Sequence, residues 1–289
     1  MKAMLLAAGR GVRMGPLTSE LPKPLLSLGA ETLIERHLRR LAAAGFGEVA
    51  INLSYRGEQI RCTIGDATPW GQTVVYSEEG EPPLETAGGI VHALPLLGEG
   101  PFVVVSTDVV TDYDFRALRA VGAELERGVE PEGGAELERR AEPERGAHLE
   151  RAADLERTAG VSGFLVLVPN PPHNPHGDFG LTSEGRLRLP EAGYRTSEAG
   201  LRAPEGRPGA ASPRYTFSGI AVFHPGLFRG LAPGIRPLRD VLRPAVRRGA
   251  LLGEVYEGLW RDVGTPERLA DARALMGGHR PRPSRDTAG

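Results

Sequence analysis

Residues 2–26 of this 289-residue chain read KAMLLAAGRGVRMGPLTSELPKPLL, an apolar stretch that runs into a glycine-rich loop. The apolar stretch over 2–7 is far shorter than the roughly 18 residues of a membrane span. Arginines at positions 10 and 13 follow it at once, which a signal peptide would not show. The stretch therefore predicts a buried β-strand, and its loop can bring backbone N–H groups close to an anion.

The chain beyond this loop alternates between short apolar stretches and segments of helical periodicity. Such alternation is typical of βαβ units, and it predicts an α/β fold with a mostly parallel sheet covered by helices on both faces. Ligands bind beyond the carboxyl ends of the strands in such sheets, so the loops after strands are the places for chemistry. The expected strands are 2–7, 48–53, 73–77, 102–106, 163–168 and 216–223, and the expected helices are 31–44, 56–64, 86–97, 112–121, 237–249 and 265–276, with Asp112 and Thr265 as N-caps.

A run of six hexapeptides interrupts this pattern over residues 122–157, beginning GAELER and ending AADLER. It holds 11 acidic residues and 6 arginines. Its period turns a helix by about 600° per repeat, so no apolar stripe forms, and Pro131 and Pro143 would break a helix in any case. We expect a mobile, low-complexity insertion that a short linker can replace; the alternative, a stacked solenoid, requires inward-facing apolar residues. The expected organisation is one domain over 1–276, interrupted at 122–158, and a disordered tail over 277–289.

The composition excludes several classes of protein. The formal net charge of −2 gives no global basic field for nucleic acid or for an anionic membrane. Cys62 is the only cysteine, so neither a disulfide framework nor a cysteine-based zinc cluster is available. His173 and His176 lie in a proline-rich loop without nearby thiols, which does not favour zinc. These features predict a cytoplasmic protein with no nucleic-acid or membrane partner, and they leave the oligomeric state open.

The glycine-rich loop carries positive charge at fixed positions. It lacks the spacing of a P-loop and of G-x-G-x-x-G, and its glycines alone are explained by an ordinary turn with solvated arginines. Arg13 lies inside the loop, however, and Lys23 lies between Pro22 and Pro24, which restrict the backbone on both sides. A fixed ammonium group beside an amide-rich loop is suited to a polyphosphate.

Five motifs occur in an order and spacing that resemble the sugar-1-phosphate nucleotidyltransferases. They are the opening loop with its Pro-Lys-Pro, LETAG at 84–88, Asp108, FSGI at 217–220 and WRDVGT at 260–265. The likeness spans 1–121 and 160–276, so it leaves out only the hexapeptides and the tail. It implies a single Rossmann-like domain with a mixed, mostly parallel sheet and an antiparallel portion near 216–223.

Within this family the likeness is greatest to enzymes that act on UTP and an amino-sugar 1-phosphate, through EEGEPPLETAGG at 78–89, TDYDF at 111–115 and GDF at 177–179. It implies transfer of UMP from UTP to N-acetylmuramate 1-phosphate with release of pyrophosphate, a step of nucleotide-sugar biosynthesis in peptidoglycan recycling. The alternatives are another nucleoside triphosphate or hexose 1-phosphate, such as mannose or glucose 1-phosphate, and a catalytically silent nucleotide-sugar sensor. The presence of Lys23, Asp108 and Asp262 argues against the sensor.

The resemblance also implies roles for individual residues. Asp108 and Asp262 would bind one Mg²⁺, an ion that needs few protein ligands, although a helix cap or a hinge explains either aspartate alone. Lys23 would hold the α-phosphate region and Arg13 the leaving pyrophosphate, with no general base because a phosphate monoester is already ionised. The nucleotide contacts would come from Ala7, Ala8, Gly9, Gly11, Gly88 and Glu81, the last with plain solvated charge as its alternative, and the sugar contacts from Asn170, Asp178 and Gly219.

Two departures from the family pattern bear on the nucleotide. Thr107 stands before Asp108 where the family often has glycine, and its side chain would either crowd the nucleotide or add a hydroxyl contact. An extra proline at 82–83 would shift Glu81 from its expected place. Neither change removes a charge that the chemistry needs.

Overall fold

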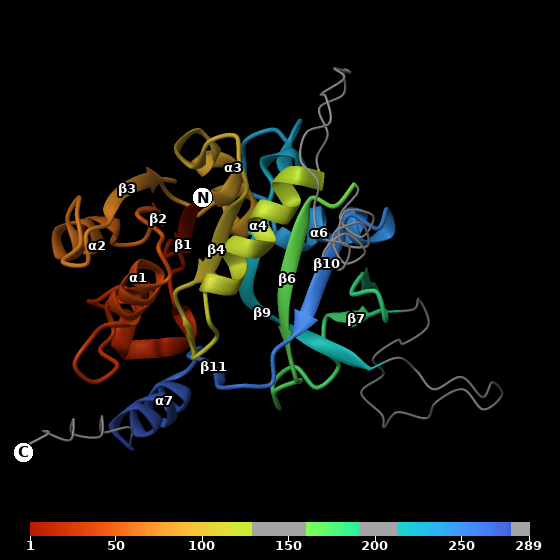
Figure 1. Ribbon diagram of the computed structural model, residues 1–289. Helices are drawn as coiled ribbons and strands as arrows, with labels where there is room; N and C mark the ends of the chain where they lie inside the picture. Colours follow the sequence, from red (N-terminus) through yellow and green to blue (C-terminus); the bar gives the residue numbers. More distant parts are fainter. Residues whose placement is uncertain (129–159, 191–212, 279–289) are drawn as a thin grey trace, which may run out of the picture.

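The computed structural model describes residues 1–128, 160–190 and 213–278 (Figure 1). The expected insertion from residue 129 onward, most of a proline- and glycine-rich stretch at 190–214 and the tail from residue 279 lie outside the described residues. The expectation that a short linker can replace the hexapeptides therefore stays a prediction.

The fold is built on a mixed sheet with the strand order β10-β6-β9-β4-β1-β2-β3. The central strand β1 pairs in parallel with β2 and β4, whereas β9 runs antiparallel to both β4 and β6. This arrangement confirms the mostly parallel sheet and its antiparallel portion near 216–223. The strands of this path are β1 (Lys2–Leu6), β2 (Glu48–Leu53), β3 (Thr73–Glu78), β4 (Phe102–Ser106), β6 (Gly163–Val168), β9 (Arg214–Phe223) and β10 (Leu251–Val255).

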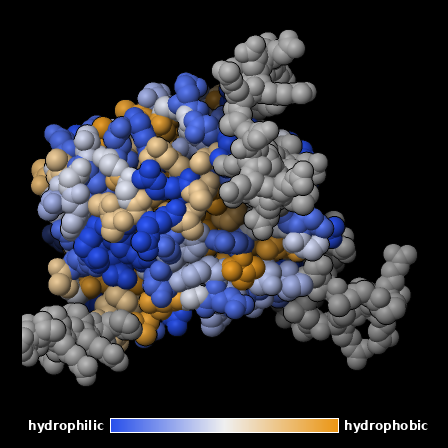
Figure 2. Space-filling model, in the orientation of Figure 1, coloured by the Kyte–Doolittle hydropathy of each residue, from blue (hydrophilic) through white to orange (hydrophobic). Residues whose placement is uncertain are grey.

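Helices cover both faces of the sheet, as the continuous apolar strands require. Along β1, Ala3 and Leu5 belong to one buried cluster with residues of α1, α2 and α4, while Met4 belongs to a second cluster with residues of α3 and α6. Hydrophilic side chains cover most of the described surface in Figure 2, with scattered apolar patches. The helices are α1 (Leu33–Ala43), α2 (Gly57–Ile64), α3 (Glu85–Leu97), α4 (Arg116–Gly128), α6 (Leu238–Arg247) and α7 (Pro266–Gly278).

Several short elements have no clear signal in the sequence. One of them is β10, because its Gly253 disfavours a strand in the sequence. In the structure, a Cβ at position 253 would lie 2.7 Å from the carbonyl oxygen of Leu165 in β6. Glycine is therefore the residue that allows the two strands to pair so closely.

The remaining elements are β5 (Val109–Thr111), β7 (Phe179–Leu181), β8 (Leu187–Arg188), β11 (Trp260–Asp262) and the 3₁₀ helices η1 (Val12–Thr18), η2 (Lys23–Leu25) and η3 (Pro225–Phe228).

The ends of two helices test the expected N-caps. Thr265 precedes α7, and its hydroxyl oxygen accepts a hydrogen bond from the backbone N–H of Arg268 at 3.4 Å, which confirms it as a cap. Asp112 is not a cap, because α4 begins only at Arg116. The carboxylate of Asp114 accepts the hydrogen bond from the backbone N–H of Arg116 instead, at 3.1 Å.

The helix α4 also continues further than expected, to Gly128. It thus takes in the first hexapeptide, residues 122–127, which was expected to belong to the mobile insertion. Leu125 of this hexapeptide is buried in the cluster with Leu118 and the strands β1 and β4. A single repeat placed directly after an amphipathic helix can extend that helix, even though six such repeats cannot keep one apolar face.

Replacing Leu125 with alanine should lower the free energy of unfolding by about 2–5 kcal/mol, because the change leaves a cavity in a closely packed core. The neighbouring exposed position offers a matched control, since Glu126→Ala should change stability by about 0.5 kcal/mol or less. Urea denaturation measures both values. Equal changes in the free energy of unfolding for the two variants would show that residues 122–127 belong to the insertion and not to α4.

The ring of His37 in α1 lies in the core, stacked on Phe115 with 6.3 Å between ring centroids. Burial lowers the pKa of His37 to about 4. The unfolded chain, with a histidine pKa near 6.5, therefore binds more protons than the folded chain as the pH falls. We expect His37 to cost about 3 kcal/mol of stability between pH 7 and pH 4, with no further loss from this group below its folded pKa.

The variant His37→Leu should remove this part of the pH dependence while the carboxylates titrate as before. The measurement is the free energy of unfolding across this pH range for both proteins. Parallel stability curves would show that the protonation of His37 does not oppose folding.

Candidate active site

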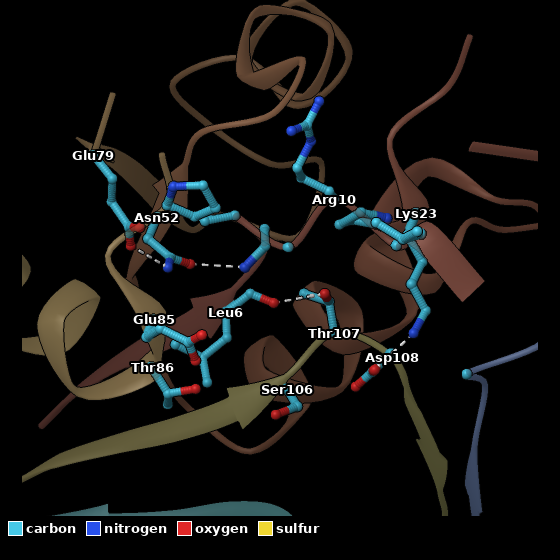
Figure 3. A pocket seen from close by; sticks show the side chains of 18 of the residues that line it. Leu6, Arg10, Lys23, Asn52, Glu79, Glu85, Thr86, Ser106, Thr107 and Asp108 are labelled. Atoms are coloured by element: carbon cyan, nitrogen blue, oxygen red, sulfur yellow. Dashed lines mark hydrogen bonds and ion pairs between the residues drawn. The ribbon is translucent and has the colours of Figure 1, made fainter. Parts of the chain in front are cut away.

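Hydrogen bonds join the ends of three neighbouring strands at the carboxyl edge of the sheet. In the parallel pairing Leu6 of β1 lies opposite Asn52 of β2, which is 4% exposed. The side-chain oxygen of Asn52 accepts from the backbone N–H of Ala7 at 2.7 Å, and its amide nitrogen donates to Glu79 at 2.6 Å. The other carboxylate oxygen of Glu79 accepts from the backbone N–H of Leu84 at 2.8 Å. These bonds fix the starts of the loops that follow β1 and β3 (Figure 3).

A cavity of about 500 Å³, here called the first cavity, opens at this edge. Arg10, Arg13 and Lys23 give its wall three positive charges, and the backbone of the glycine-rich loop supplies N–H groups. Such a combination is suited to the phosphates of a nucleotide. The lining residues are Leu6, Ala7, Ala8, Gly9, Arg10, Gly11, Val12, Arg13, Lys23, Pro24, Asn52, Glu79, Pro83, Glu85, Thr86, Ser106, Thr107, Asp108 and Gly264.

An ion pair between Lys23 and Asp108 lies in the wall of the first cavity. The Lys23 ammonium nitrogen lies 2.7 Å from Asp108 Oδ2, and Lys23 is only 9% exposed (Figure 3). Lys23 begins the 3₁₀ helix η2, with Pro22 before it and Pro24 after it, so its backbone is held as the sequence predicts. The lysine thus lies at a fixed position between the glycine-rich loop and the end of β4.

The two aspartates come from adjacent segments of a small antiparallel ladder. Strands β5 and β11 pair with Asp262 opposite Val109, and the backbone N–H of Val263 donates to the carbonyl of Asp108 at 2.8 Å. This ladder brings residues that are 154 positions apart in the sequence to one place. Its strands are three residues long, which is too short for a sequence pattern to reveal.

Only one oxygen of Asp262 has a partner within the described residues. Oδ2 lies 2.9 Å from His173 Nε2 and accepts a hydrogen bond from Arg268. Oδ1 is buried and receives no hydrogen bond from the described part of the chain. A buried carboxylate oxygen without a donor is an acceptor that a ligand can use.

A second cavity, of about 370 Å³, adjoins the first. The two cavities share Leu6, Thr86, Ser106 and Asp108 in their walls, so they meet at the end of β4. Two ligands that react with each other would therefore meet beside Asp108. The second cavity is lined by Leu6, Thr86, Val104, Ser106, Asp108, Val109, His173, Asn174, Thr216, Phe217, Ser218, Gly219, Leu238, Trp260 and Asp262.

The structure brings most of the expected site residues together. Ala7, Ala8, Gly9, Gly11, Arg13 and Lys23 line the first cavity, Gly219 and Asp262 the second, and Asp108 both. The hydroxyl group of Thr107 donates to the carbonyl of Leu6 at 2.7 Å, so it is engaged with the neighbouring strand.

Four expected contact residues line neither cavity, and their predicted contacts with base and sugar stay predictions. The backbone N–H of Gly88 donates to the carbonyl of Arg236 at 3.1 Å, and Glu81 is exposed. Asn170 accepts from the Thr216 hydroxyl at 3.0 Å, and Asp178 accepts from the backbone N–H of Phe217 at 2.8 Å. Asn170 and Asp178 thus support the start of β9, which forms a wall of the second cavity.

Other residues that line the two cavities are not predicted from the sequence. A signal for Asn52 and Glu79 exists, because both are polar residues near the carboxyl ends of predicted strands, where ligands bind in such sheets. Glu79, two positions before Glu81, is an acid that lines the first cavity. His173 and Asn174 have no such signal, because a proline-rich loop carries them to the second cavity.

Comparison with known proteins identifies the family of this chain. Residues 2–130 match the nucleotidyl transferase family, and the chain belongs to this family. It is 41% identical over 278 residues to the N-acetylmuramate alpha-1-phosphate uridylyltransferase of Neisseria meningitidis, covering 96% of this chain and 99% of the relative. The protein of the same name from Caulobacter vibrioides is 29% identical over 277 residues, covering 95% of this chain and 96% of the relative.

Solved structures agree on the fold. A crystal structure from Bacillus anthracis, in complex with sucrose and assigned as a glucose-1-phosphate thymidylyltransferase, aligns with a TM-score of 0.68 at 18% identity. The alignment covers 95% of this chain and 94% of that chain. None of the helices in residues 1–128, 160–190 and 213–278 has both the length and the apolar character needed to cross a membrane.

Proposed function

We propose that this nucleotidyltransferase transfers UMP from UTP to N-acetylmuramate 1-phosphate and releases pyrophosphate. The observation that carries the proposal is the meeting of the two cavities beside Asp108, the first of them lined on one side by the glycine-rich loop and Lys23. The likeness to the two uridylyltransferases over nearly the whole chain supports the choice of substrates.

The reaction joins two anions, so positioning and charge neutralisation supply most of the catalysis. An oxygen of the sugar phosphate forms a bond to the α-phosphorus of UTP while the bond from that phosphorus to the oxygen bridging it to the β-phosphorus breaks. Pyrophosphate leaves with that oxygen. No proton has to be removed from the attacking phosphate, so no general base is needed. Lys23 neutralises the α-phosphate region, and Arg13 the departing pyrophosphate.

The residues present fit a divalent cation. Asp108 and Asp262 would hold Mg²⁺, which prefers oxygen ligands and keeps several waters and phosphate oxygens around it. The unpartnered Oδ1 of Asp262 is suited to this role. A Cβ at Gly264 would lie 2.8 Å from this oxygen, so glycine keeps the space beside it free. The ion supplies neutralisation of phosphate charge.

The second cavity has the chemistry of a sugar site. Phe217 and Trp260 give it apolar surface, while His173, Asn174 and Thr216 add polar groups. The side chain of Asn174 donates to the hydroxyl oxygen of Thr216 at 3.1 Å, which orients both groups in the wall. We propose that Gly219 contacts the sugar phosphate and that Asn170 and Asp178 act by holding this wall in place.

A substrate panel tests the proposal. The purified enzyme with Mg²⁺ would be assayed for pyrophosphate release with UTP, GTP, dTTP, ATP and CTP against the 1-phosphates of N-acetylmuramate, mannose and glucose. We expect UTP with N-acetylmuramate 1-phosphate to give a kcat/KM at least about 100-fold above the other pairs, because polar groups of the site would be left unpaired by them. A higher value for another pair would replace the proposed substrates.

A further inference from the structure

The first residue of α3 has an unusual backbone conformation. Glu85 has φ of +62°, and Arg56 is the only other non-glycine residue with positive φ in the described part of the chain. A side chain in this left-handed region is destabilising, because the Cβ approaches the following carbonyl oxygen. A glutamate that only complements the dipole of a helix N-terminus does not need this conformation.

Contacts on both sides of Glu85 hold the backbone in place. The carbonyl of Leu84 accepts from the backbone N–H of Arg236 at 2.9 Å, and its own N–H donates to Glu79 at 2.8 Å. On the other side, the backbone N–H of Ala87 donates to the carbonyl of Arg236 at 3.0 Å. A strained residue persists when its surroundings determine its conformation in this way, and such residues gather at ligand sites.

The carboxylate of Glu85 is available to a ligand. It lines the first cavity and forms no hydrogen bond or ion pair within the described residues, whereas both carboxylate oxygens of Glu79 accept hydrogen bonds. In Figure 3 Glu85 lies with Thr86 and Leu6, on the side of the cavity away from Lys23. The first cavity thus has positive charge on one side and a free acceptor on the other.

We propose that Glu85 is a specificity-determining residue whose carboxylate accepts hydrogen bonds from the uncharged part of the bound nucleotide. Phosphates go to the positive side of the first cavity, and a carboxylate repels them. The groups left to face Glu85 are the donors of the nucleoside, either ribose hydroxyl groups or an N–H of the base. The inference rests on the proposed function only in requiring a nucleoside triphosphate in the first cavity.

The test uses three variants and equilibrium binding of nucleotides in the presence of Mg²⁺, without sugar phosphate. Glu85→Gln removes the charge at almost constant shape, and Glu85→Gly removes the side chain together with the backbone strain. Glu99→Gln, exposed just beyond the other end of α3, is the control. The nucleotides are UTP, 2′-deoxy-UTP, 3′-deoxy-UTP and N3-methyl-UTP.

We expect both Glu85 variants to bind UTP about 10- to 100-fold more weakly than the wild type, and the control to bind it unchanged. The wild type and the Glu85 variants should bind with equal affinity the analogue that lacks the hydrogen-bond donor to Glu85. If that analogue is a deoxy-UTP, the donor is a ribose hydroxyl group; if it is N3-methyl-UTP, the donor is the N–H of the base. Glu85→Gly should also melt at a higher temperature than the wild type, since its strain is relieved. A structural role alone would not combine higher stability with weaker binding.

Two results would overturn the inference. One is that both Glu85 variants bind UTP as tightly as the wild type. The other is an equal loss for all four nucleotides, which would indicate general electrostatics. If the wild type prefers another nucleoside triphosphate, UTP is the wrong substrate in the proposed function, and the same comparison with analogues of the preferred nucleotide still tests Glu85.

Discussion

Asp262→Asn is expected to lower kcat by about 10³-fold or more while the protein stays folded, and Asp108→Asn should do the same. Each change keeps the size of the side chain but removes one of the two negative charges proposed to hold Mg²⁺. For Asp262 the change acts at a carboxylate whose Oδ1 is buried without a partner. Steady-state turnover as a function of Mg²⁺ concentration measures the effect.

Asp271 provides the matched control, because it is an exposed aspartate in the nearby helix α7. Asp271→Asn should retain wild-type turnover and Mg²⁺ dependence. Circular dichroism and thermal unfolding establish that the variants are folded. Near-normal turnover of either Asp108→Asn or Asp262→Asn would remove that residue from the proposed metal pair.

Lys23→Ala should lower kcat by about 10²- to 10³-fold, because it removes a positioned donor for the charge that develops in the transition state. The Arg10→Ala variant should lose about 10-fold or less, although Arg10 lines the same cavity. The difference lies in their surroundings. Lys23 is buried, fixed by two prolines and paired with Asp108, whereas Arg10 is exposed and lies over the ring of Tyr55, 5.3 Å from its centroid.

Pyrophosphate release at saturating substrates measures both variants. Lys23→Arg is an informative addition, since it keeps the charge but not the compact ammonium group. Equal losses for Lys23→Ala and Arg10→Ala would show that the loop acts through its total charge and not through one placed ammonium group.

The sequence is sufficient for most of the parallel core, because β1, β2 and β4 are apolar stretches and helices such as α1 have a clear apolar face. It does not reveal β10, although this strand pairs in parallel with β6. The sequence does not predict elements that are too short to show a repeating pattern of apolar residues. The β5–β11 ladder is the important case: the motifs indicate both aspartates, but only the pairing of Val109 with Asp262 shows why they lie together.

The first cavity is more predictable from the sequence than the second. The glycine-rich loop and Lys23 are close in sequence, so their joint role follows from local constraints. The second cavity is assembled from β4, β9, β11 and the loop that carries His173, and no local pattern links these segments. Tertiary contacts alone decide that Asn174 lines this cavity while Asn170 supports it from behind.

The first hexapeptide shows a limit of a different kind. Composition groups residues 122–127 with the five repeats that follow, since all six are rich in charge and poor in core-forming residues. The structure separates this repeat from the rest because its Leu125 falls on the buried face of a helix that is already formed. The periodicity of the six repeats does not show that α4, which begins before them, continues through the first repeat.

In the proposed reaction, an oxygen of the sugar phosphate attacks the α-phosphorus of UTP where the two cavities meet. The direct measurement uses N-acetylmuramate 1-phosphate labelled with ¹⁸O in its phosphate group, followed by mass spectrometry of the products. We predict that the UDP-sugar retains all of the label, with unlabelled pyrophosphate released in equal amount. Label in the pyrophosphate, or release of UMP without a UDP-sugar, would rule out this reaction.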